Sequence, residues 1–273
     1  MKHKFTKSEL LKLLDNNFNK PVPEIAKLVG LSRNGFYYHL KKHNLTKKNV
    51  RFNEHAFKTI KNEQTSYWLG FLMADGYINV KGNTKWFHLK LAGKDEIHFK
   101  KFHTFLDSKI KARKYKLKDG REIIESRHYS NILCNDLIKH GCIPRKSLKL
   151  KFPNIPNFLL NHFIRGYFDG DGCINICRKN QNTPQMRIFT IGTKNFLDSL
   201  QSFFITIFNY KSKKYQRTGK AYILEIGGSK QCEQILQWLY SDASIYLNRK
   251  YNVWKKYRSA YPVKKKKPNR LLS

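Results

Sequence analysis

The sequence predicts an α+β protein made of two similar units, each with the order helix, two strands, helix, two strands, helix, after a small all-helical unit. The first observation behind this prediction is an internal repeat, SYWLGFLMADGYINV from Ser66 and NHFIRGYFDGDGCINI from Asn161. The second is that segments of alternating polarity and segments of helical spacing follow both copies in the same order. With 273 residues, the chain is long enough for one or two domains with a sizeable core.

The N-terminal residues predict three short helices. Thr6-Lys7-Ser8-Glu9 has the form of a capping box, so we expect a first helix to about Asn17. Pro21 and Pro23 then break the chain, a short helix over 24–29 ends at a glycine, and Ser32 can cap a third helix. This pattern is typical of a DNA-binding helix-turn-helix, although a three-helix capping domain would share it. We expect the third helix to present these residues to DNA: Arg33, Asn34, Tyr37, Tyr38, His39, Lys41 and Lys42.

The segments after each motif predict matching sets of elements. After the first motif we expect strands at 86–93, 113–118 and 122–128, and helices at 95–106 and 134–139. After the second we expect strands at 186–192, 211–217 and 221–227, and helices at 195–208 and 230–240. The chain then divides into a helix-turn-helix domain at 1–46, a basic linker at 47–58, a first repeat at 59–152, a second repeat at 153–262 and a basic tail at 263–273.

Small residues recur four positions apart in both motifs. Two small residues on one helix face let a pair of helices pack with their backbones nearly touching. The predicted contact residues of this helix interface are Gly70, Ala74, Gly166 and Gly170. A further glycine follows each helix, Gly76 and Gly172, where we expect the left-handed conformation that favours glycine.

Asp75 and Asp171 end the two motif helices, where the partial negative charge of the helix dipole disfavours a carboxylate. If the helices pack side by side, the two carboxylates converge and require a cation nearby. A divalent metal with oxygen ligands meets that requirement. An Asp-Gly pair is often only a turn, but here both copies place it at the end of a small-residue helix.

The segments WLGFLMADG (68–76) and IRGYFDGDG (164–172) resemble the paired signature of single-chain LAGLIDADG homing endonucleases, and the resemblance covers about residues 55–262. It implies that the motif helices form the interface of pseudo-twofold halves and that two four-stranded sheets form a saddle in the DNA major groove. It further implies a monomer that cuts both strands of a long, near-asymmetric DNA target, as in intron homing, and leaves short 3′ overhangs. In that family the last motif acids bind Mg²⁺, with Mn²⁺ as a substitute, which maps onto Asp75 and Asp171. Lys146 and Lys250 match the basic residue late in each half and would be catalytic, or alternatively simple phosphate contacts.

Strand alternation predicts which side chains face DNA. Apolar positions, including Val80, should face the helices, and the polar positions between them should face outward. The predicted DNA-facing residues are Tyr77, Asn79, Lys81, His88 and Lys90 in the first repeat, and Asn175, Arg187, Thr190, Lys213 and Gln216 in the second. For each of them the alternative is an ordinary solvated surface residue.

The net charge of +35, from 54 Lys and Arg against 19 Asp and Glu, favours a polyanionic partner. Double-stranded DNA is the expected partner, and the Lys264–Lys267 run of the tail predicts a further phosphate contact. The sequence has no apolar run of about 18 residues and no apolar signal core after Met1, so we expect no membrane partner. We expect a cytoplasmic-type compartment, in a bacterium, a phage-infected cell or an organelle matrix. Five cysteines without a C-x-x-C pair predict free thiols.

Two other functions remain open on the same scaffold. One is an RNA maturase, whose partner would be intron RNA. The other is a transcriptional regulator that binds DNA without cutting it. Both motif carboxylates, Asp75 and Asp171, are present, which favours cleavage over either alternative.

Overall fold

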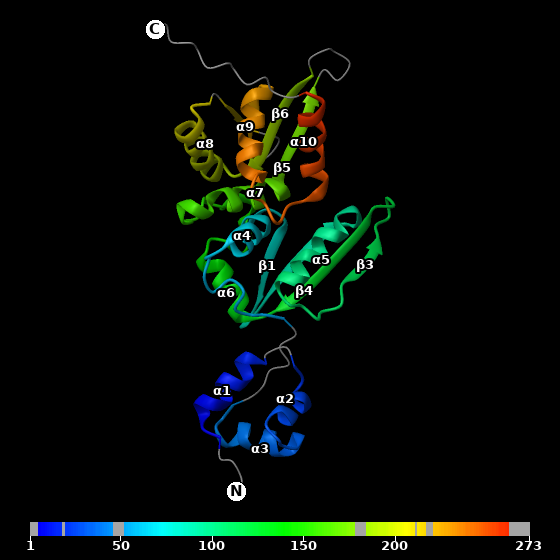
Figure 1. The fold of residues 1–273 in the computed structure, drawn as a ribbon, viewed down its shortest axis with the longest axis vertical. Coiled ribbons are helices and arrows are strands. Elements are labelled where there is room, and N and C mark those ends of the chain that lie inside the picture. The colour runs from blue at the N-terminus through cyan, green and yellow to red at the C-terminus, as the bar shows by residue number, and fades with distance from the viewer. Residues whose placement is uncertain are drawn as a thin grey trace, which may run out of the picture.

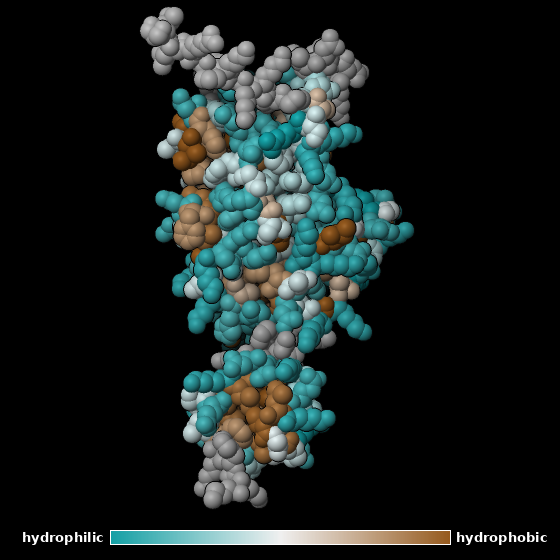
Figure 2. All heavy atoms as spheres, in the orientation of Figure 1, coloured by the Kyte–Doolittle hydropathy of each residue, from teal (hydrophilic) through white to brown (hydrophobic). Residues whose placement is uncertain are grey.

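The computed structural model describes residues 5–17, 20–45, 52–177, 184–210, 212–216 and 221–261. Within these ranges, the N-terminal helical unit has a small hydrophobic core of its own, and the two repeats share a large one (Figure 1). Hydrophilic residues cover most of the face seen in Figure 2. The predicted tail at 263–273 and residues 47–51 of the predicted linker lie outside the described residues.

The N-terminal unit consists of α1 (Lys7–Asn16), α2 (Val22–Leu28) and α3 (Arg33–Lys42). Thr6 caps α1 in the predicted capping box, and the Ser32 hydroxyl caps α3. Gly30, between α2 and α3, has a φ of 66°, which a glycine adopts without strain. The prediction that Pro21 and Pro23 only break the chain is wrong, because both lie at the start of α2, where the first helical turn needs no amide donors.

The two repeats contain the same elements in the same order, which confirms the predicted fold class. The first comprises α4 (Glu63–Asp75), β1 (Gly76–Lys81), β2 (Thr84–Ala92), α5 (Glu96–Phe105), β3 (Arg113–Lys116), β4 (Glu122–Tyr129) and α6 (Asn131–Lys139). The second comprises α7 (Leu160–Asp171), β5 (Gly172–Cys177), β6 (Gln185–Gly192), α8 (Lys194–Phe208), β7 (Lys213–Gln216), β8 (Tyr222–Gly227) and α9 (Ser229–Tyr240). The antiparallel sheets have corresponding orders, β1-β2-β4-β3 and β5-β6-β8-β7.

Two further features extend the predicted repeats. A helix absent from the prediction, α10 (Asn248–Ala260), packs on α9, and the rings of Trp254 and Tyr240 stack with centroids 5.5 Å apart. At the other end, Phe52 and Phe57 lie in the segment predicted as a linker but are buried in the main core. Residues 52–58 therefore pack with the first repeat.

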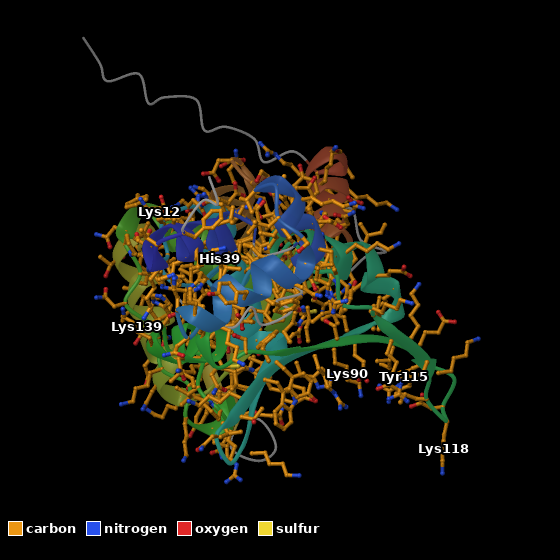
Figure 3. The ribbon with its side chains drawn as sticks, turned by 90° about the horizontal axis from the view of Figure 1, so that it is seen from below. Lys12, His39, Lys90, Tyr115, Lys118 and Lys139 are labelled. Atoms are coloured by element: carbon orange, nitrogen blue, oxygen red, sulfur yellow. The ribbon has the colours of Figure 1, made fainter. Side chains whose placement is uncertain are left out.

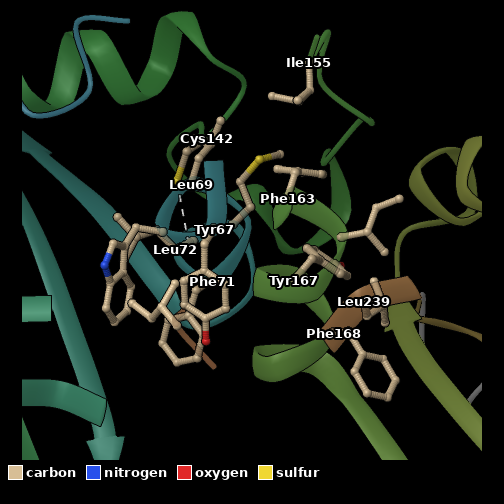
Figure 4. Close-up of a cluster of buried hydrophobic side chains, with 14 of the residues drawn as sticks. Tyr67, Leu69, Phe71, Leu72, Cys142, Ile155, Phe163, Tyr167, Phe168 and Leu239 are labelled. Atoms are coloured by element: carbon tan, nitrogen blue, oxygen red, sulfur yellow. Dashed lines mark hydrogen bonds between the residues drawn. The ribbon is translucent and has the colours of Figure 1, made fainter. Parts of the chain in front are cut away.

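The interface between α4 and α7 joins the repeats, and its large aromatic side chains surround the helix contact (Figure 4). A Cβ on Gly70 would overlap the carbonyl oxygen of Phe163, and a Cβ on Gly166 would overlap that of Tyr67. A Cβ on Gly170 would overlap the Cβ of Ala74. The structure therefore brings the four predicted small residues together, and the two backbones are in direct contact.

The glycines that follow the motif helices are needed for space and not for a left-handed backbone. Gly76 and Gly172 have φ values of −83° and −96°, in the extended region, so the prediction of a left-handed cap is wrong. A Cβ on Gly76 would lie 2.5 Å from the ring of Phe87, and a Cβ on Gly172 would overlap Phe168. In each repeat the first strand begins at this glycine, directly after the helix, and an aromatic ring fills the space that a side chain would occupy.

We predict that Gly166→Ala destabilises the protein by about 2 kcal/mol, because overpacking at the backbone contact outweighs the gain of about 1 kcal/mol in helix propensity. The matched control is Gly227→Ala, because a Cβ there meets no atom within 4 Å. Urea unfolding of both variants gives the comparison. Equal stability of Gly166→Ala and the unmodified protein would contradict the close-packed interface.

Candidate functional site

The two motif carboxylates lie at the paired C-terminal ends of α4 and α7. Asp75 is the last residue of α4 and Asp171 is the last residue of α7, and both are half-buried. A Cβ on Gly170 would lie 3.4 Å from Asp75 Oδ2, so the Asp75 carboxylate reaches across to α7. The structure thus brings the two predicted acidic residues together.

Burial makes both carboxylates hard to ionise, and at Asp75 the negative charge of Asp171 adds to this effect. The pKa of Asp75 is raised to about 6, first by burial and then by the charge of Asp171, against the lowering effects of Lys250 and Lys146. Burial also raises the pKa of Asp171, and Lys146 and then Lys250 lower it. Of the two lysines, Lys250 has the larger effect on Asp75 and Lys146 has the larger effect on Asp171, so each carboxylate is influenced by the lysine of the other repeat.

Lys146 and Lys250 occupy corresponding places beside the helix ends. Lys146 Nζ donates to the carbonyl oxygen of Ala74 at 2.8 Å. Lys250 Nζ donates to the carbonyl oxygens of Phe168 and Asp169, both at 2.7 Å, and to that of Gly170 at 3.3 Å. Both lysines are buried, and burial lowers the pKa of Lys250 to about 8. Each ammonium group binds carbonyls of the last helical turn and opposes the negative end of the dipole, although the Phe168 carbonyl also accepts from the Gly172 amide.

The donor set of this site suits a Mg²⁺ ion. Among the described residues there is no group of three or more His, Cys, Asp or Glu side chains that could hold a metal, so Asp75 and Asp171 would provide two carboxylates and no more. Mg²⁺ is usually held by one or two carboxylates, with waters and substrate phosphates in the remaining positions. The raised pKa values of both carboxyl groups also indicate a place where a cation would be favourable.

An arginine buried between the repeats, absent from the sequence predictions, ties them together at the start of α4, which is the opposite end of that helix from Asp75. Arg165 of α7 is fully buried, and its Nη2 donates to Glu63 Oε1 of α4 at 2.6 Å. Its other nitrogens donate to the carbonyl oxygens of Leu239 at 2.7 Å and Ile245 at 3.0 Å. The lone arginine in the apolar run HFIRGYF was the sequence signal. Asp169, also fully buried, was missed in the same motif.

The outward face of the first sheet carries most of the residues predicted to contact DNA. Tyr77, Lys81 and Lys90 are exposed and Asn79 is partly exposed, on one face of the sheet by register. Figure 3 shows Lys90 near Tyr115, and Lys90 Nζ lies 5.7 Å from the centre of that ring. Further residues on this face, which the prediction missed, are Trp86, Arg113, Tyr115, Arg127 and Tyr129.

His88 is on the predicted face but is not exposed. The Tyr77 and His88 rings are 4.6 Å apart, and His88 Nε2 lies 3.3 Å from Glu125 Oε2. Only 3% of His88 is exposed, and burial lowers its pKa. The prediction of direct contact is therefore wrong for His88, which packs against Tyr77 as its cross-strand neighbour. Val80, predicted to face inward, is 49% exposed near the strand end.

The second sheet exposes part of its predicted set. Asn175, Arg187 and Lys213 are exposed, and the Arg187 guanidinium donates to Glu225 Oε1 at 3.0 Å. Thr190 pairs with Gly172 and is buried on the helix-packed face, so its predicted contact with DNA is wrong. Gln216 lies on the opposite face of β7 from Lys213, because it is three positions further along the strand.

Helix α3 exposes the side predicted to contact DNA. Its Phe36 and Leu40 face the small core, while Tyr37 and Tyr38 are 43% and 64% exposed. The Arg33 guanidinium lies 5.7 Å from the centre of the Tyr37 ring. Of the remaining predicted residues of this helix, His39 is half-buried, and the exposed ones are Asn34, Lys41 and Lys42. Figure 3 views this unit from below.

The structure also bears on membrane-spanning helices and on the pairing of the cysteines. Among the described residues, no helix has the length and apolar character needed to cross a membrane. The five cysteines are free, and three of them are buried in the main core. The prediction of unpaired thiols is therefore confirmed.

Comparisons with known proteins show what this chain is similar to. Residues 159–237 match the family model of the LAGLIDADG-like domain. The crystal structure of LAGLIDADG homing endonuclease I-GzeII in complex with its DNA target is similar with a TM-score of 0.52 at 12% identity, over 73% of this chain and 90% of that chain. The I-SmaMI LAGLIDADG homing endonuclease bound to cleaved DNA is similar with a TM-score of 0.51 at 12% identity, over 72% and 88%. At this identity the likeness establishes the fold.

A curated protein of Methanocaldococcus jannaschii is also similar in sequence. It is named a probable translation initiation factor IF-2 and is 32% identical over 168 residues, which are 57% of this chain and 13% of that protein. The chain spans a small part of that relative, so the match concerns a segment and does not extend to the activity of the larger protein.

We predict that Asp75→Asn stabilises the metal-free protein at about pH 7.5, by on the order of 1–2 kcal/mol. The pKa of Asp75 in the folded protein, about 6, is above its ordinary value of 3.8, so folding favours the protonated form. The resulting contribution to stability is present below the ordinary pKa and is lost as the pH rises through about 6. The variant should therefore have little effect at about pH 4.

Urea unfolding in EDTA at both pH values measures this difference. Asp119→Asn, at an exposed turn, is the control and should change stability little at about pH 7.5. A gain for Asp75→Asn of the same size at both pH values would contradict the electrostatic explanation.

Proposed function

We propose that this chain, which carries a LAGLIDADG-like domain on the fold of the LAGLIDADG homing endonucleases, is a site-specific, Mg²⁺-dependent DNA endonuclease. It would act as a monomer on a long, near-asymmetric DNA target. Each repeat would hydrolyse one phosphodiester, and the two cuts would leave short 3′ overhangs. We also propose intron homing as its biological setting, in a cytoplasmic-type compartment.

The observation that carries this proposal is the pair of carboxylates at the ends of two tightly packed helices. Asp75 and Asp171 come from different repeats, and each lies where its repeat's sheet begins. When a phosphodiester of one DNA strand lies near the first carboxylate, the opposite strand, bound by the other sheet, would therefore lie near the second carboxylate. This arrangement supports paired cuts in a duplex better than a single hydrolytic site would.

The residues of the site would divide the work as follows. Asp75 and Asp171 would hold Mg²⁺, which supplies charge stabilisation for the phosphate and lowers the pKa of the attacking water. Lys146, with one backbone acceptor for its ammonium group, keeps donors available for a phosphate oxygen. Lys250 already donates to three carbonyl oxygens, so it would act mainly through its charge. Half-burial of both carboxylates limits competing solvent.

The sheet faces would bind the DNA. The exposed faces offer cations for phosphates and amides for base edges, with Asn79 and Asn175 four residues beyond their motif aspartates. The net charge of +35 predicts strong, salt-dependent attraction to a duplex. Over the range from about 50 to 200 mM salt, many phosphate contacts would lower the affinity by on the order of 1,000-fold.

The N-terminal unit would hold DNA beside the cut site. Its core is separate from that of the repeats, and α3 exposes Arg33, Asn34, Tyr37 and Tyr38 on one side. A short helix with exposed amide, aromatic and cationic groups fits a major groove. We therefore propose that α3 is the second helix of a DNA-binding helix-turn-helix.

We predict that Asp75→Asn and Asp171→Asn each reduce double-strand cleavage at least about 100-fold, because each removes a carboxylate that would hold Mg²⁺. DNA binding in EDTA should remain close to that of the unmodified protein. Asp198→Asn, at a partly exposed position of α8 where the carboxylate pairs with Lys194 and Lys214, is the control and should cut normally.

The test is a cleavage selection on a random or genomic DNA library, with Mg²⁺ and with EDTA. Metal-dependent cutting at one long site that either variant loses would support the proposal. Normal cutting by a variant would refute the assignment of its carboxylate. Tight DNA binding without cutting would favour the regulator, and stronger binding to structured intron RNA would favour the maturase.

We predict that Arg33→Ala weakens binding by about 3- to 10-fold on a duplex that extends beyond the cut site, because it removes one cationic contact. A duplex trimmed to the site itself should bind both proteins equally. Lys12→Ala, at an exposed position of α1, is the control (Figure 3). Equal loss on both duplexes would contradict a flanking contact, and so would no loss on either.

A further inference from the structure

The second repeat contains a fully buried carboxylate whose charge the cleavage mechanism does not use. Asp169 lies in α7, two residues before Asp171, and has no exposed surface. Three donors converge on it: Tyr67 Oη at 2.8 Å, Tyr240 Oη at 2.7 Å and the amide nitrogen of Leu247 at 2.7 Å. They come from α4, from α9 and from the residue that precedes α10.

These hydrogen bonds attach the start of α10 to α7. Leu247 is the N-cap residue of α10 and lacks a side-chain cap of its own, and its amide donates to Asp169 Oδ2. Lys250 is three residues later, in the first turn, and its ammonium group donates back to the carbonyl oxygen of Asp169 at 2.7 Å. Asp169 therefore holds α10 at two points, once through its side chain and once through its backbone.

The first repeat has no such attachment. The position that corresponds to Asp169 is Met73, which is buried and offers only a weakly accepting thioether sulfur in place of a carboxylate. Lys146 lies in a 3-10 turn (Lys146–Leu148) after Arg145, and one hydrogen bond joins its ammonium group to α4. The two lysines thus reach equivalent helix ends by different means.

We propose that Asp169 is a positioning residue that fixes Lys250 at the end of α7, and that the second repeat's site depends on a carboxylate which the first repeat does without. Tyr67 belongs to the first repeat, so the position of Lys250 also depends on the packing of α4 against α7. A consequence that rests on the proposed endonuclease function is that Asp169 matters for only one of the two DNA strands.

The first test needs neither metal nor DNA. The rate at which an amine-acetylating reagent modifies each lysine of the full chain is measured by mass spectrometry, with Lys146 as the internal comparison. Asp169→Met introduces the residue that the first repeat has, and we expect it to raise the rate at Lys250 by about tenfold while Lys146 stays unchanged. Asp169→Asn keeps an acceptor oxygen for Leu247 and should stay near the unmodified protein.

Two further variants separate the loss of the Asp169 contacts from a general disturbance of the fold. Met73→Leu disturbs the corresponding place in the first repeat and should leave Lys250 unchanged. If Asp169→Met does not fold, the double variant Tyr67→Phe and Tyr240→Phe removes two of the three donors and should also raise the rate at Lys250. An unchanged rate at Lys250, or an equal rise at Lys146, would overturn the proposal.

The second test resolves the two strands of the selected DNA target. We expect Asp169→Met to slow cleavage of one strand by about tenfold or more, so that nicked DNA accumulates, and Asp169→Asn to restore cutting of both. Equal slowing on both strands would overturn the strand-specific role. If the unmodified protein cuts no DNA, the endonuclease proposal fails, while the acetylation rates still decide the role of Asp169.

Discussion

The contact between the backbones of α4 and α7 is the constraint on which the rest of this structure depends. Glycines at 70 and 166 let a carbonyl of each helix occupy the space of a side chain on the other. With the helices in contact, their C-terminal ends lie together, and so do the carboxylates of their last residues and the first strands of the two sheets. Small residues at a few positions thus determine where two sheets and two acidic residues meet.

This geometry has an electrostatic cost that the fold offsets locally. Two helix C-termini, two carboxylates and a buried Asp169 all favour positive charge, and Lys146 and Lys250 provide it. The lysines contact backbone carbonyls and do not form direct ion pairs with Asp75 or Asp171. Consequently the carboxylates keep raised pKa values and lone pairs that can bind a ligand. A better neutralised site would be more stable, but it would also bind a cation less well.

The sequence predicts the repeats, their elements and the helix contact, because these depend on local periodicity and on residue size. It does not predict α10, whose exposed side is so polar that a buried side of Trp254 and Tyr257 is difficult to recognise. His88 is buried by Tyr77 and Glu125 of the neighbouring strands, and the alternation of polarity along one strand contains no information about such neighbours. The network around Asp169 joins segments up to 102 residues apart, so only the folded chain reveals it.

The two repeats share a backbone plan but differ in the side chains placed on it. Asn79 and Asn175 occupy the same register, yet their cross-strand partners are Trp86 in one sheet and Arg187 in the other. The motif helices differ likewise, with Met73 in α4 where α7 has Asp169. The close-packed interface tolerates little change, because a Cβ on Gly70 or Gly166 would meet the backbone of the other helix. The exposed faces and the attachment of each lysine are free of that restriction, and there the two halves carry different side chains on the same backbone plan.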